Sequence, residues 1–307
     1  MKKAIVTGAT GFIGSWLVDE LLENGYSVTL IVRNKERLLS RFIENCFVIE
    51  NAVQGNQIYD FPKEHTDVLF HLAWEGVSSE EKNDIDIQIE NIKMSLNVMS
   101  AAHESGCDLF VSAGTVAEYA LCDNVMDLAA RQTPDDFYGA AKASVYYFLE
   151  VKARQLELPF IWCVIPSTYG ERRSDSNIIT YTIKSLLQGQ KPIYGNLAQM
   201  WEFLYVKDVV RALRLIGEQG KKGKVYGIGS GEYKMLQDYI YRIRDVINMA
   251  LPLGIGESLV YSDRTFSSCV NNYDLKKDTG FQPEYTFEEG ITRTIEYYRK
   301  QIEQAHS

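Results

Sequence analysis

The fold of this chain is decided by residues 2–14, which read KKAIVTGATGFIG. The apolar run Ala4-Ile5-Val6 has the length and the β-branching of a buried parallel strand. An amphipathic helix is predicted to begin at Phe12 and to end at Asn24-Gly25, a typical helix stop. A strand, a tight turn and a helix in this order are the start of a βαβ unit.

The turn between the strand and the helix carries three glycines, Gly8, Gly11 and Gly14. Residues without a Cβ can take unusual backbone angles and let a bound group approach the main chain. The amides at the helix start then face that group, and the helix dipole favours negative charge there. The spacing G-x-x-G-x-x-G differs from the commoner G-x-G-x-x-G. It predicts a dinucleotide pyrophosphate site, and an ordinary tight βα loop is the alternative.

Composition agrees with a cytoplasmic enzyme. The chain has 307 residues and a formal net charge of -9, which argues against nucleic-acid binding because an anionic protein repels phosphate backbones. Lys2-Lys3 is followed by too few apolar residues for a signal peptide, and no stretch approaches the roughly 18 apolar residues of a membrane span. The five cysteines are scattered and odd in number, so we expect reduced packing residues. Four dispersed histidines make a metal site improbable, and we predict none.

Strands alternate with helices through the first half of the chain. The predicted strands are 26–32, 67–73, 108–113 and 160–165, and the predicted long helices are 85–104 and 137–157. This alternation predicts an α/β fold with a doubly wound parallel sheet of the Rossmann type. We expect a dinucleotide-binding domain over 1–169, with its sheet completed by about 203–228. Residues 170–202 and 229–307 are expected to form a smaller, interleaved substrate-binding lobe.

The end of the second predicted strand bears on the choice between NAD and NADP. In NAD-selective sites a carboxylate about 20 residues past the glycines binds the ribose 2′-hydroxyl. Here that place holds Arg33, followed by Asn34, Lys35 and Arg37. A guanidinium can bind a 2′-phosphate with paired hydrogen bonds, so NADP is favoured over NAD. Solvated charges on a surface loop are the alternative.

An acid/base pair is predicted at Tyr138 and Lys142, which share one face of a helix because they are four residues apart. Tyrosine titrates near 10, and acid/base work near neutrality requires a drop of about 3 units, or roughly 4 kcal/mol. One positive charge about 4 Å away, at an effective dielectric near 20, supplies about that energy. Small polar residues end the preceding strand at Ser112–Thr115, where an open α/β sheet places its chemistry.

Several segments together resemble the extended short-chain dehydrogenase/reductase family, in its NAD(P)-dependent sugar epimerase/dehydratase branch. The resemblance covers nearly the whole chain, in the same order of motifs. The segments are the turn at residues 7–14, His71-Leu72-Ala73, Thr115 with Tyr119, the Tyr138/Lys142 pair, YVKDVV at 205–210, DTGFQP at 278–283 and FEEGI at 287–291.

The resemblance implies roles for individual residues. Tyr138 would be the general acid/base, Lys142 would lower its pKa and hold the nicotinamide ribose, and Thr115 would donate to the same substrate oxygen. Asp60 would bind the adenine amino group, with a turn cap before Pro62 as the alternative. The full set implied to bind the cofactor is Gly8, Thr10, Gly11, Phe12, Ile13, Gly14, Arg33, Asp60, Phe61, Leu72, Ala73, Tyr138, Lys142 and Pro166.

The resemblance also implies substrate contacts at Thr115, Asn177, Trp201 and Arg264. Asn177 is equally a candidate helix N-cap, and the two roles are compatible. Trp201 stands where relatives often place an arginine that binds the substrate's phosphates. An indole cannot pair with a phosphate but can stack on a base or a sugar. Arg264, or the pair Arg172 and Arg173, could supply the missing charge, with surface arginines as the alternative.

Departures from the family bear on the reaction. Sugar 4,6-dehydratases of this family follow the catalytic threonine with acidic residues, whereas this chain has Val116 and Ala117, and Glu118 would point elsewhere. We therefore expect an NAD(P)-dependent epimerase or 4-keto reductase that acts on a nucleotide-activated sugar by hydride transfer, at C4. The alternatives are an NADP-dependent reductase of a small ketone or aldehyde, a nucleotide-sugar 4,6-dehydratase and a non-catalytic dinucleotide sensor.

The family resemblance also implies a homodimer. The helices over 85–104 and 137–157 would pair with their copies in a four-helix bundle. Their second apolar faces could instead pack within the monomer.

Overall fold

The computed structural model describes residues 1–50, 61–78, 80–120, 125–173, 177–258 and 269–306. Asp60 and Arg264 lie outside these ranges. The strands are β1 (Lys3–Thr7), β2 (Ser27–Val32), β3 (Phe47–Glu50), β4 (Val68–His71), β5 (Phe110–Thr115), β6 (Phe160–Ile165), β7 (Ser167–Tyr169), β8 (Ile193–Tyr194), β9 (Met200–Trp201), β10 (Phe203–Tyr205), β11 (Val225–Gly227), β12 (Lys234–Met235) and β13 (Gly254–Ile255). The α-helices are α1 (Phe12–Glu23), α2 (Ser40–Asn45), α3 (Ile85–Glu104), α4 (Phe137–Leu156), α5 (Ile178–Leu187), α6 (Val206–Gln219), α7 (Leu236–Asn248), α8 (Tyr273–Thr279) and α9 (Phe287–His306), with the 3₁₀ turns η1 (Lys35–Arg37) and η2 (Val116–Tyr119).

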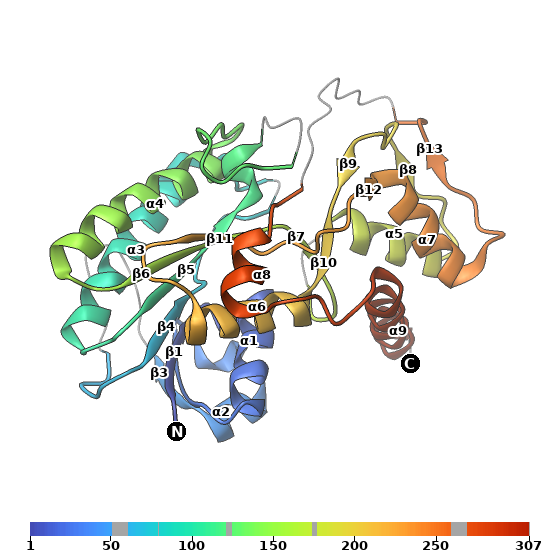
Figure 1. Cartoon of the computed structure of the whole chain (residues 1–307). Helices are drawn as coiled ribbons and strands as arrows, with labels where there is room; N and C mark the ends of the chain where they lie inside the picture. The colour runs from blue at the N-terminus through green and yellow to red at the C-terminus, as the bar shows by residue number, and fades with distance from the viewer. Residues whose placement is uncertain (51–60, 79, 121–124, 174–176, 259–268, 307) are drawn as a thin grey trace.

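Seven strands of the described chain form one parallel sheet in the order β3-β2-β1-β4-β5-β6-β11 (Figure 1). The chain winds outward from β1 to β3 and then returns to β4, so the direction of winding reverses between β1 and β4. This confirms the predicted α/β fold of the Rossmann type. In such a sheet ligands bind outside the carboxyl ends of the strands at the reversal point.

Helices cover both faces of the sheet, as the apolar runs in its strands require. Successive residues of β1 face opposite sides, so Val6 packs in the core cluster of α1 and α6, and Ile5 packs in that of α3 and α4. Leu17 of α1 and Leu149 of α4 are fully buried in these two clusters. The sheet is therefore a rigid central layer, and the carboxyl ends of its strands have fixed positions.

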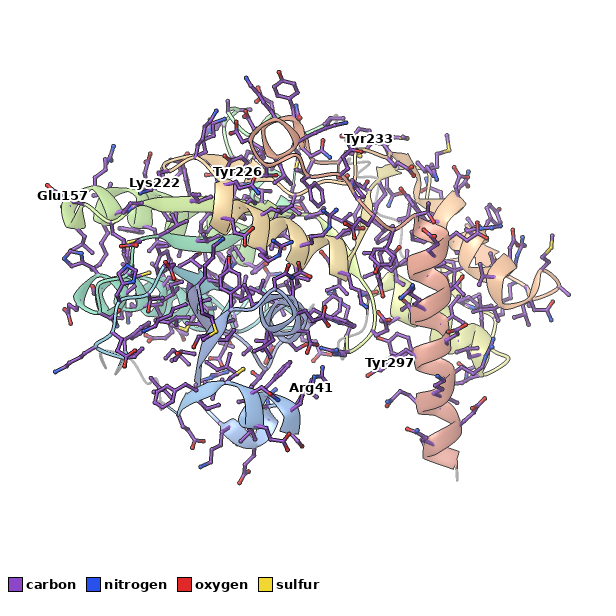
Figure 2. The ribbon with its side chains drawn as sticks, turned by 60° about the horizontal axis from the view of Figure 1, so that its bottom comes forward. Arg41, Glu157, Lys222, Tyr226, Tyr233 and Tyr297 are labelled. Carbon is purple, nitrogen blue, oxygen red and sulfur yellow. The ribbon has the colours of Figure 1, made fainter. Side chains whose placement is uncertain are left out.

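A second group of elements lies beside the sheet (Figure 1) and contains α5, α7 and α9 with the strand pairs β9–β12 and β8–β13. Its core is rich in aromatic rings, including Tyr169, Phe203 and Tyr239. Figure 2 shows the long helix α9, which carries Tyr297, in the foreground of this group. The chain returns from it to add β11 to the sheet edge beside β6. The two parts are thus interleaved in sequence.

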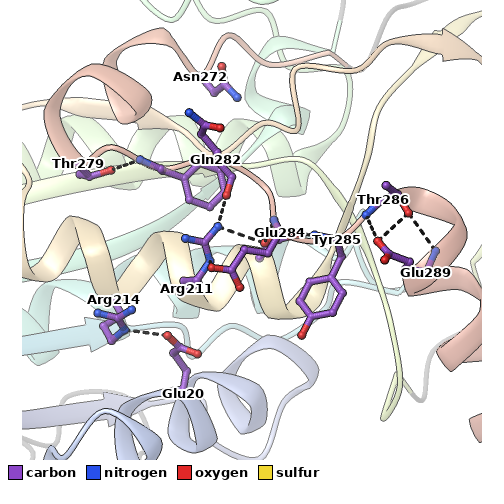
Figure 3. Close-up of polar contacts among 12 residues, drawn as sticks. Glu20, Arg211, Arg214, Asn272, Thr279, Gln282, Glu284, Tyr285, Thr286 and Glu289 are labelled. Carbon is purple, nitrogen blue, oxygen red and sulfur yellow. Dashed lines mark hydrogen bonds and ion pairs between the residues drawn. The ribbon is translucent and has the colours of Figure 1, made fainter.

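Polar contacts tie α6 to the segment that joins α8 and α9. The buried Asp208 carboxylate accepts hydrogen bonds from the Glu284 and Tyr285 amides at 2.8 and 3.1 Å. Arg211 donates to the Gln282 carbonyl and pairs with Glu284 (Figure 3). Because α6 also packs on the sheet, these contacts hold the second group of elements against it.

Within the part of the chain that the structure describes, no helix combines the length and the apolar character needed to cross a membrane.

Candidate active site

The glycine turn has the geometry of an anion cradle. Gly8 has a φ of +80°, and a Cβ on it would lie 2.6 Å from the carbonyl carbon of Leu72. A Cβ on Gly14 would collide with the Gly8 carbonyl oxygen. Helix α1 begins directly after Gly11, which offers no side-chain cap to its first amides. The turn therefore requires glycine at these places and leaves amides at the helix start for a ligand.

Two adjoining cavities lie at the carboxyl ends of the strands, and they share Gly8, Gly11, Leu72 and Trp74. One, of about 190 Å³, lies on the β2 side and is lined by Arg33 among others. The other, of about 470 Å³, extends from the glycine turn to the ends of β5 and β6. We call the two together the cleft.

Most of the predicted site residues line the cleft. These are Gly8, Thr10, Gly11, Phe12, Ile13, Gly14, Arg33, Leu72, Ala73, Thr115, Tyr138, Lys142 and Pro166. Phe61 instead packs against the core between the sheet and α3 and lines neither cavity. Asn177 caps α5, because its side chain accepts hydrogen bonds from the Ile179 and Thr180 amides. Trp201 packs near Phe203, outside the cleft.

Tyr138 is positioned by the first turn of α4. Asp136 caps this helix by accepting from the Gly139 amide at 2.7 Å, and the Tyr138 amide donates to the Lys82 carbonyl at 2.9 Å. Gly139 allows α4 to pack closely on η2, since a Cβ there would collide with the Ala117 carbonyl. Tyr138 and Thr115, which precedes η2, therefore face the same cavity.

The proton affinity of the Tyr138 phenol reflects its surroundings. Burial raises the pKa of Tyr138 to about 12, and the charges of Glu118 and Asp136 act in the same direction. A hydrogen bond with Thr115 and the positive charge of Arg173 lower it. Acidification by Lys142, which the helical spacing led us to expect, is not among these contributions.

Lys142 is buried at the floor of the cleft. Its ammonium donates to the Ala113 carbonyl at 2.7 Å and lies 3.8 Å from the centre of the Trp74 ring. Burial lowers the pKa of Lys142 to about 7, and the negative charge of Glu118 opposes that shift. Because burial disfavours the charged ammonium, Lys142 has less charge to place beside the phenol than an exposed lysine would have. Acidification of Tyr138 by Lys142 therefore stays a prediction for the complex with a dinucleotide.

Trp74 lines both cavities of the cleft, and sequence reasoning missed it. Its indole nitrogen donates to Gln88 at 3.0 Å, and its ring meets that of Tyr138 edge-on with centres 6.1 Å apart. Asn91 holds the next residue, Glu75, through both its backbone N–H and its carbonyl. Trp74 contacts both members of the predicted acid/base pair. Its position directly after the predicted strand 67–73, at the edge where an open α/β sheet places its chemistry, was a signal for this role.

The two neighbouring arginines, which the sequence could not separate, have different surroundings. Arg172 pairs with Asp19 at 2.7 Å and lies over the Trp16 ring. Arg173 lines the cleft beside Tyr138, and its guanidinium donates to the Thr168 carbonyl at 2.9 Å. Arg173 is thus the arginine whose charge reaches the cleft.

The residues present fit a bound dinucleotide. The glycine turn can receive the pyrophosphate, and the smaller cavity with Arg33 can receive the adenosine half. The larger cavity then places the other half beside Tyr138 and Lys142. A dinucleotide there would supply a reversible hydride acceptor.

Known proteins resemble this chain along almost its entire length. Residues 4–229 match the model of the NAD dependent epimerase/dehydratase family. A dTDP-glucose 4,6-dehydratase of Escherichia coli is 27% identical over 96% of this chain and 92% of its own.

Two solved structures share the fold. A UDP-N-acetylglucosamine 4-epimerase from Methanobrevibacter ruminantium, solved with UDP-N-acetylmuramic acid, superposes with a TM-score of 0.85 at 23% identity and covers 98% of this chain and 99% of its own. A UDP-glucuronic acid 4-epimerase from Bacillus cereus, solved with UDP-glucuronic acid and NAD, gives 0.81 at 22% identity, with the same coverage. The glycine turn and the family match therefore agree, and the chain belongs to the NAD-dependent epimerase/dehydratase family, whose members include nucleotide-sugar epimerases and dehydratases.

Proposed function

We propose that this chain is an NAD(P)-dependent enzyme that transfers hydride at C4 of a nucleotide-activated sugar, as a 4-epimerase or a 4-keto reductase. The observation that carries the proposal is that one cavity of about 470 Å³ is lined by the glycine turn, Thr115, Tyr138 and Lys142 together. A dinucleotide sensor needs the turn but not the acid/base set. The names of the similar proteins, which are UDP-sugar epimerases and dTDP-sugar dehydratases, support a nucleotide sugar as substrate.

Each residue of the set has a task in this reaction. The Tyr138 phenolate takes the proton from the sugar hydroxyl as a carbonyl forms, and the resulting phenol returns the proton when the carbonyl is reduced. The Thr115 hydroxyl donates to the same sugar oxygen and stabilises the charge that develops on it. The Lys142 ammonium lowers the cost of the phenolate and binds the ribose hydroxyls. Arg173 adds positive charge on the substrate side of the cavity.

The arrangement around η2 argues against dehydration. Removal of water from the sugar needs a proton donor and an acceptor beside C5 and C6, and Val116 and Ala117 carry neither. Glu118, the acidic residue of η2, does not line the cavity, because its carboxylate is fully buried and binds Gln132 and Trp162.

Product analysis distinguishes the two reactions. Incubation with UDP- and dTDP-hexoses, in the presence of NAD or NADP, is expected to give products of unchanged mass that differ at C4. For a reductase, the corresponding 4-keto sugars are reduced. A product that has lost water would identify a dehydratase and contradict this part of the proposal.

We infer that NADP is used in preference to NAD, because Arg33 and Arg37 both line the adenosine side of the cleft. Arg33 now pairs with Glu75, another residue of the same cavity, so a 2′-phosphate would have to replace the Glu75 carboxylate as its partner. Arg33→Ala is expected to weaken NADP binding about 10-fold, the loss of one charge-assisted pair, and to leave NAD binding nearly unchanged. Isothermal titration with the two dinucleotides measures this.

Glu75→Gln supplies the matched comparison for this prediction. It frees Arg33 without removing positive charge, so NADP affinity should rise while NAD affinity stays constant. Equal losses for both dinucleotides in Arg33→Ala would contradict the NADP preference.

We further infer a homodimer, formed through α3 and α4 at one side of the sheet (Figure 1). The outer faces of these helices expose large apolar side chains, among them Ile89, Tyr147, Phe148 and Val151. Burial of such a patch against a copy stabilises association by roughly 25 cal/mol per Å² of apolar surface.

Phe148→Glu is expected to shift the chain to a monomer, because a carboxylate at the centre of an apolar interface would lose its hydration. Light scattering after size exclusion gives the mass directly. Met249→Glu changes an exposed apolar residue at the end of α7 and should leave the dimer intact. A monomeric wild-type chain at the same concentration would contradict the inference.

A further inference from the structure

A buried carboxylate lies behind the active site without lining it. Glu118 is fully buried and accepts hydrogen bonds from the Thr115 amide at 2.7 Å, from Gln132 at 2.7 Å and from the Trp162 indole at 3.2 Å. Removal of a carboxylate from water costs several kcal/mol unless hydrogen bonds and an opposite charge compensate it. Because a buried carboxylate is costly, its presence beside a candidate active site indicates that it has a function there.

The surrounding strand is shaped around this carboxylate. A Cβ on Gly114 would lie 2.7 Å from a Glu118 carboxylate oxygen and would collide with the Trp162 indole nitrogen. Gly114 separates Ala113, whose carbonyl accepts from the Lys142 ammonium, from Thr115, whose amide donates to Glu118. The ammonium and the carboxylate thus bind two residues at the end of β5, Ala113 and Thr115, which Gly114 alone separates.

We propose that Glu118 is a positioning residue of the active site, which keeps the Lys142 ammonium charged inside the cleft and holds the Thr115 backbone from behind the strand. Each charge favours the other. Burial lowers the pKa of Lys142 and raises the pKa of Glu118, and the opposite charge of the partner opposes each shift. The use of a charged Lys142 in catalysis rests on the proposed function. The effect of Glu118 on the charge of Lys142 does not.

Other titratable groups face this pair from every element packed on it, and they keep their charge state near neutrality. Tyr119 of η2 and Tyr138 and Tyr146 of α4 stay protonated, because burial, together with the negative charge of Glu118, raises their pKa values. His71 of β4 stays neutral, because burial and the charge of Lys142 lower its pKa to about 3. A titration of the site near neutrality therefore reports on Glu118 and Lys142.

Trp74 provides a reporter for the test, because the Lys142 ammonium lies 3.8 Å from its ring centre. The fluorescence of the chain minus that of its Trp74→Phe variant gives the signal of Trp74 without the signals of the other three tryptophans. The signal is followed from about pH 5 to about pH 10, between the ordinary values of carboxyl and amino groups. In the Glu118→Gln background, compared with its own Trp74→Phe double variant, the midpoint is expected to fall by about 1–3 pH units, since the ammonium loses its counter-charge.

Two further variants sharpen the result. Asp208→Asn also removes a fully buried carboxylate, but one that binds the Glu284 and Tyr285 amides and does not line the cleft, so its midpoint should equal that of the parent chain. Trp162→Phe keeps the charge of Glu118 but removes the indole N–H that donates to its carboxylate, so the titration midpoint should fall by less than in Glu118→Gln. This variant provides the test if Glu118→Gln does not fold.

Equal midpoints in the parent and in both Glu118→Gln and Trp162→Phe would overturn the proposal, as would the absence of any Trp74 titration in all three. The measurement needs no substrate. A chain that turns over no nucleotide sugar would therefore contradict the proposed function, but the titration of Trp74 fluorescence could still be interpreted. Unchanged midpoints in a chain that is active would contradict only the role of Glu118.

Discussion

Tyr138→Phe is expected to lower turnover of the nucleotide sugar by about 10²–10⁴-fold, the range that a positioned general acid/base contributes. The variant removes one oxygen and keeps the ring that meets Trp74 edge-on. Since the glycine turn and Arg33 are proposed to bind the other end of the dinucleotide, dinucleotide affinity should change little. The loss should therefore appear in kcat.

The measurement pairs steady-state kinetics with dinucleotide titration of the same preparation. Tyr297→Phe is the matched control: it makes the same change on α9, away from the cleft (Figure 2), and should keep full activity. Wild-type turnover by Tyr138→Phe would remove this residue from the mechanism. A parallel loss of dinucleotide affinity would show that the phenol acts in binding instead.

Gly14→Ala is expected to weaken dinucleotide binding by about 10–100-fold, because overpacking of a close contact costs about 1–3 kcal/mol and displaces the turn. The added methyl group would meet the carbonyl of Gly8 and the Cα of Ala9, which are backbone atoms and cannot turn aside as a side chain can. The turn must open, and its amides then no longer converge on one pyrophosphate. The thermal shift produced by NAD or NADP measures the loss.

Gly195→Ala is the control for this prediction. A Cβ on Gly195 meets nothing within 4 Å, so the variant should bind both dinucleotides as the wild type does. Circular dichroism of Gly14→Ala separates a local change in the turn from general unfolding. A folded Gly14→Ala chain with unaltered affinity would show that the pyrophosphate does not bind at this turn.

The sequence predicts the regular elements of the sheet domain well, because their apolar periodicities are long. The helix Ile85–Glu104 and the strand Phe160–Ile165 have the predicted limits. Sequence reasoning missed β3, since Phe47–Glu50 is a four-residue edge strand with both end residues exposed and gives almost no periodic signal. The short strand pairs β9–β12 and β8–β13 depend on tertiary contacts between distant segments, which no local pattern records.

The site was predictable where a motif fixes both residue type and position. The glycine turn, Thr115 and Tyr138 come together at one cavity from three separate segments. Contacts that arise only on folding were not predictable: Lys142 lies against the face of Trp74, and Glu118 turns inward to Trp162. A glutamate in a short turn after a strand has the sequence pattern of a surface residue.

These contacts change the role that is expected for Lys142. Spacing alone suggested a lysine that acidifies Tyr138 directly, whereas burial brings the pKa of Lys142 itself to about 7. The charge of Lys142 therefore depends on its surroundings, and Glu118 is the carboxylate that raises its pKa. In this view the chemistry of the cleft is set partly by a residue that does not line it.

Hydride is proposed to pass between a sugar carbon and a dinucleotide bound in this cleft. The most direct test is a single turnover with a nucleotide hexose carrying deuterium at C4, followed by mass spectrometry of the bound dinucleotide and by the near-ultraviolet absorbance of reduced nicotinamide. Deuterium is expected on the nicotinamide in the wild type and not in Tyr138→Phe. A bound dinucleotide that stays unlabelled and unreduced with every UDP- and dTDP-hexose, while binding of the sugar nucleotide is measurable, would contradict the proposed hydride transfer.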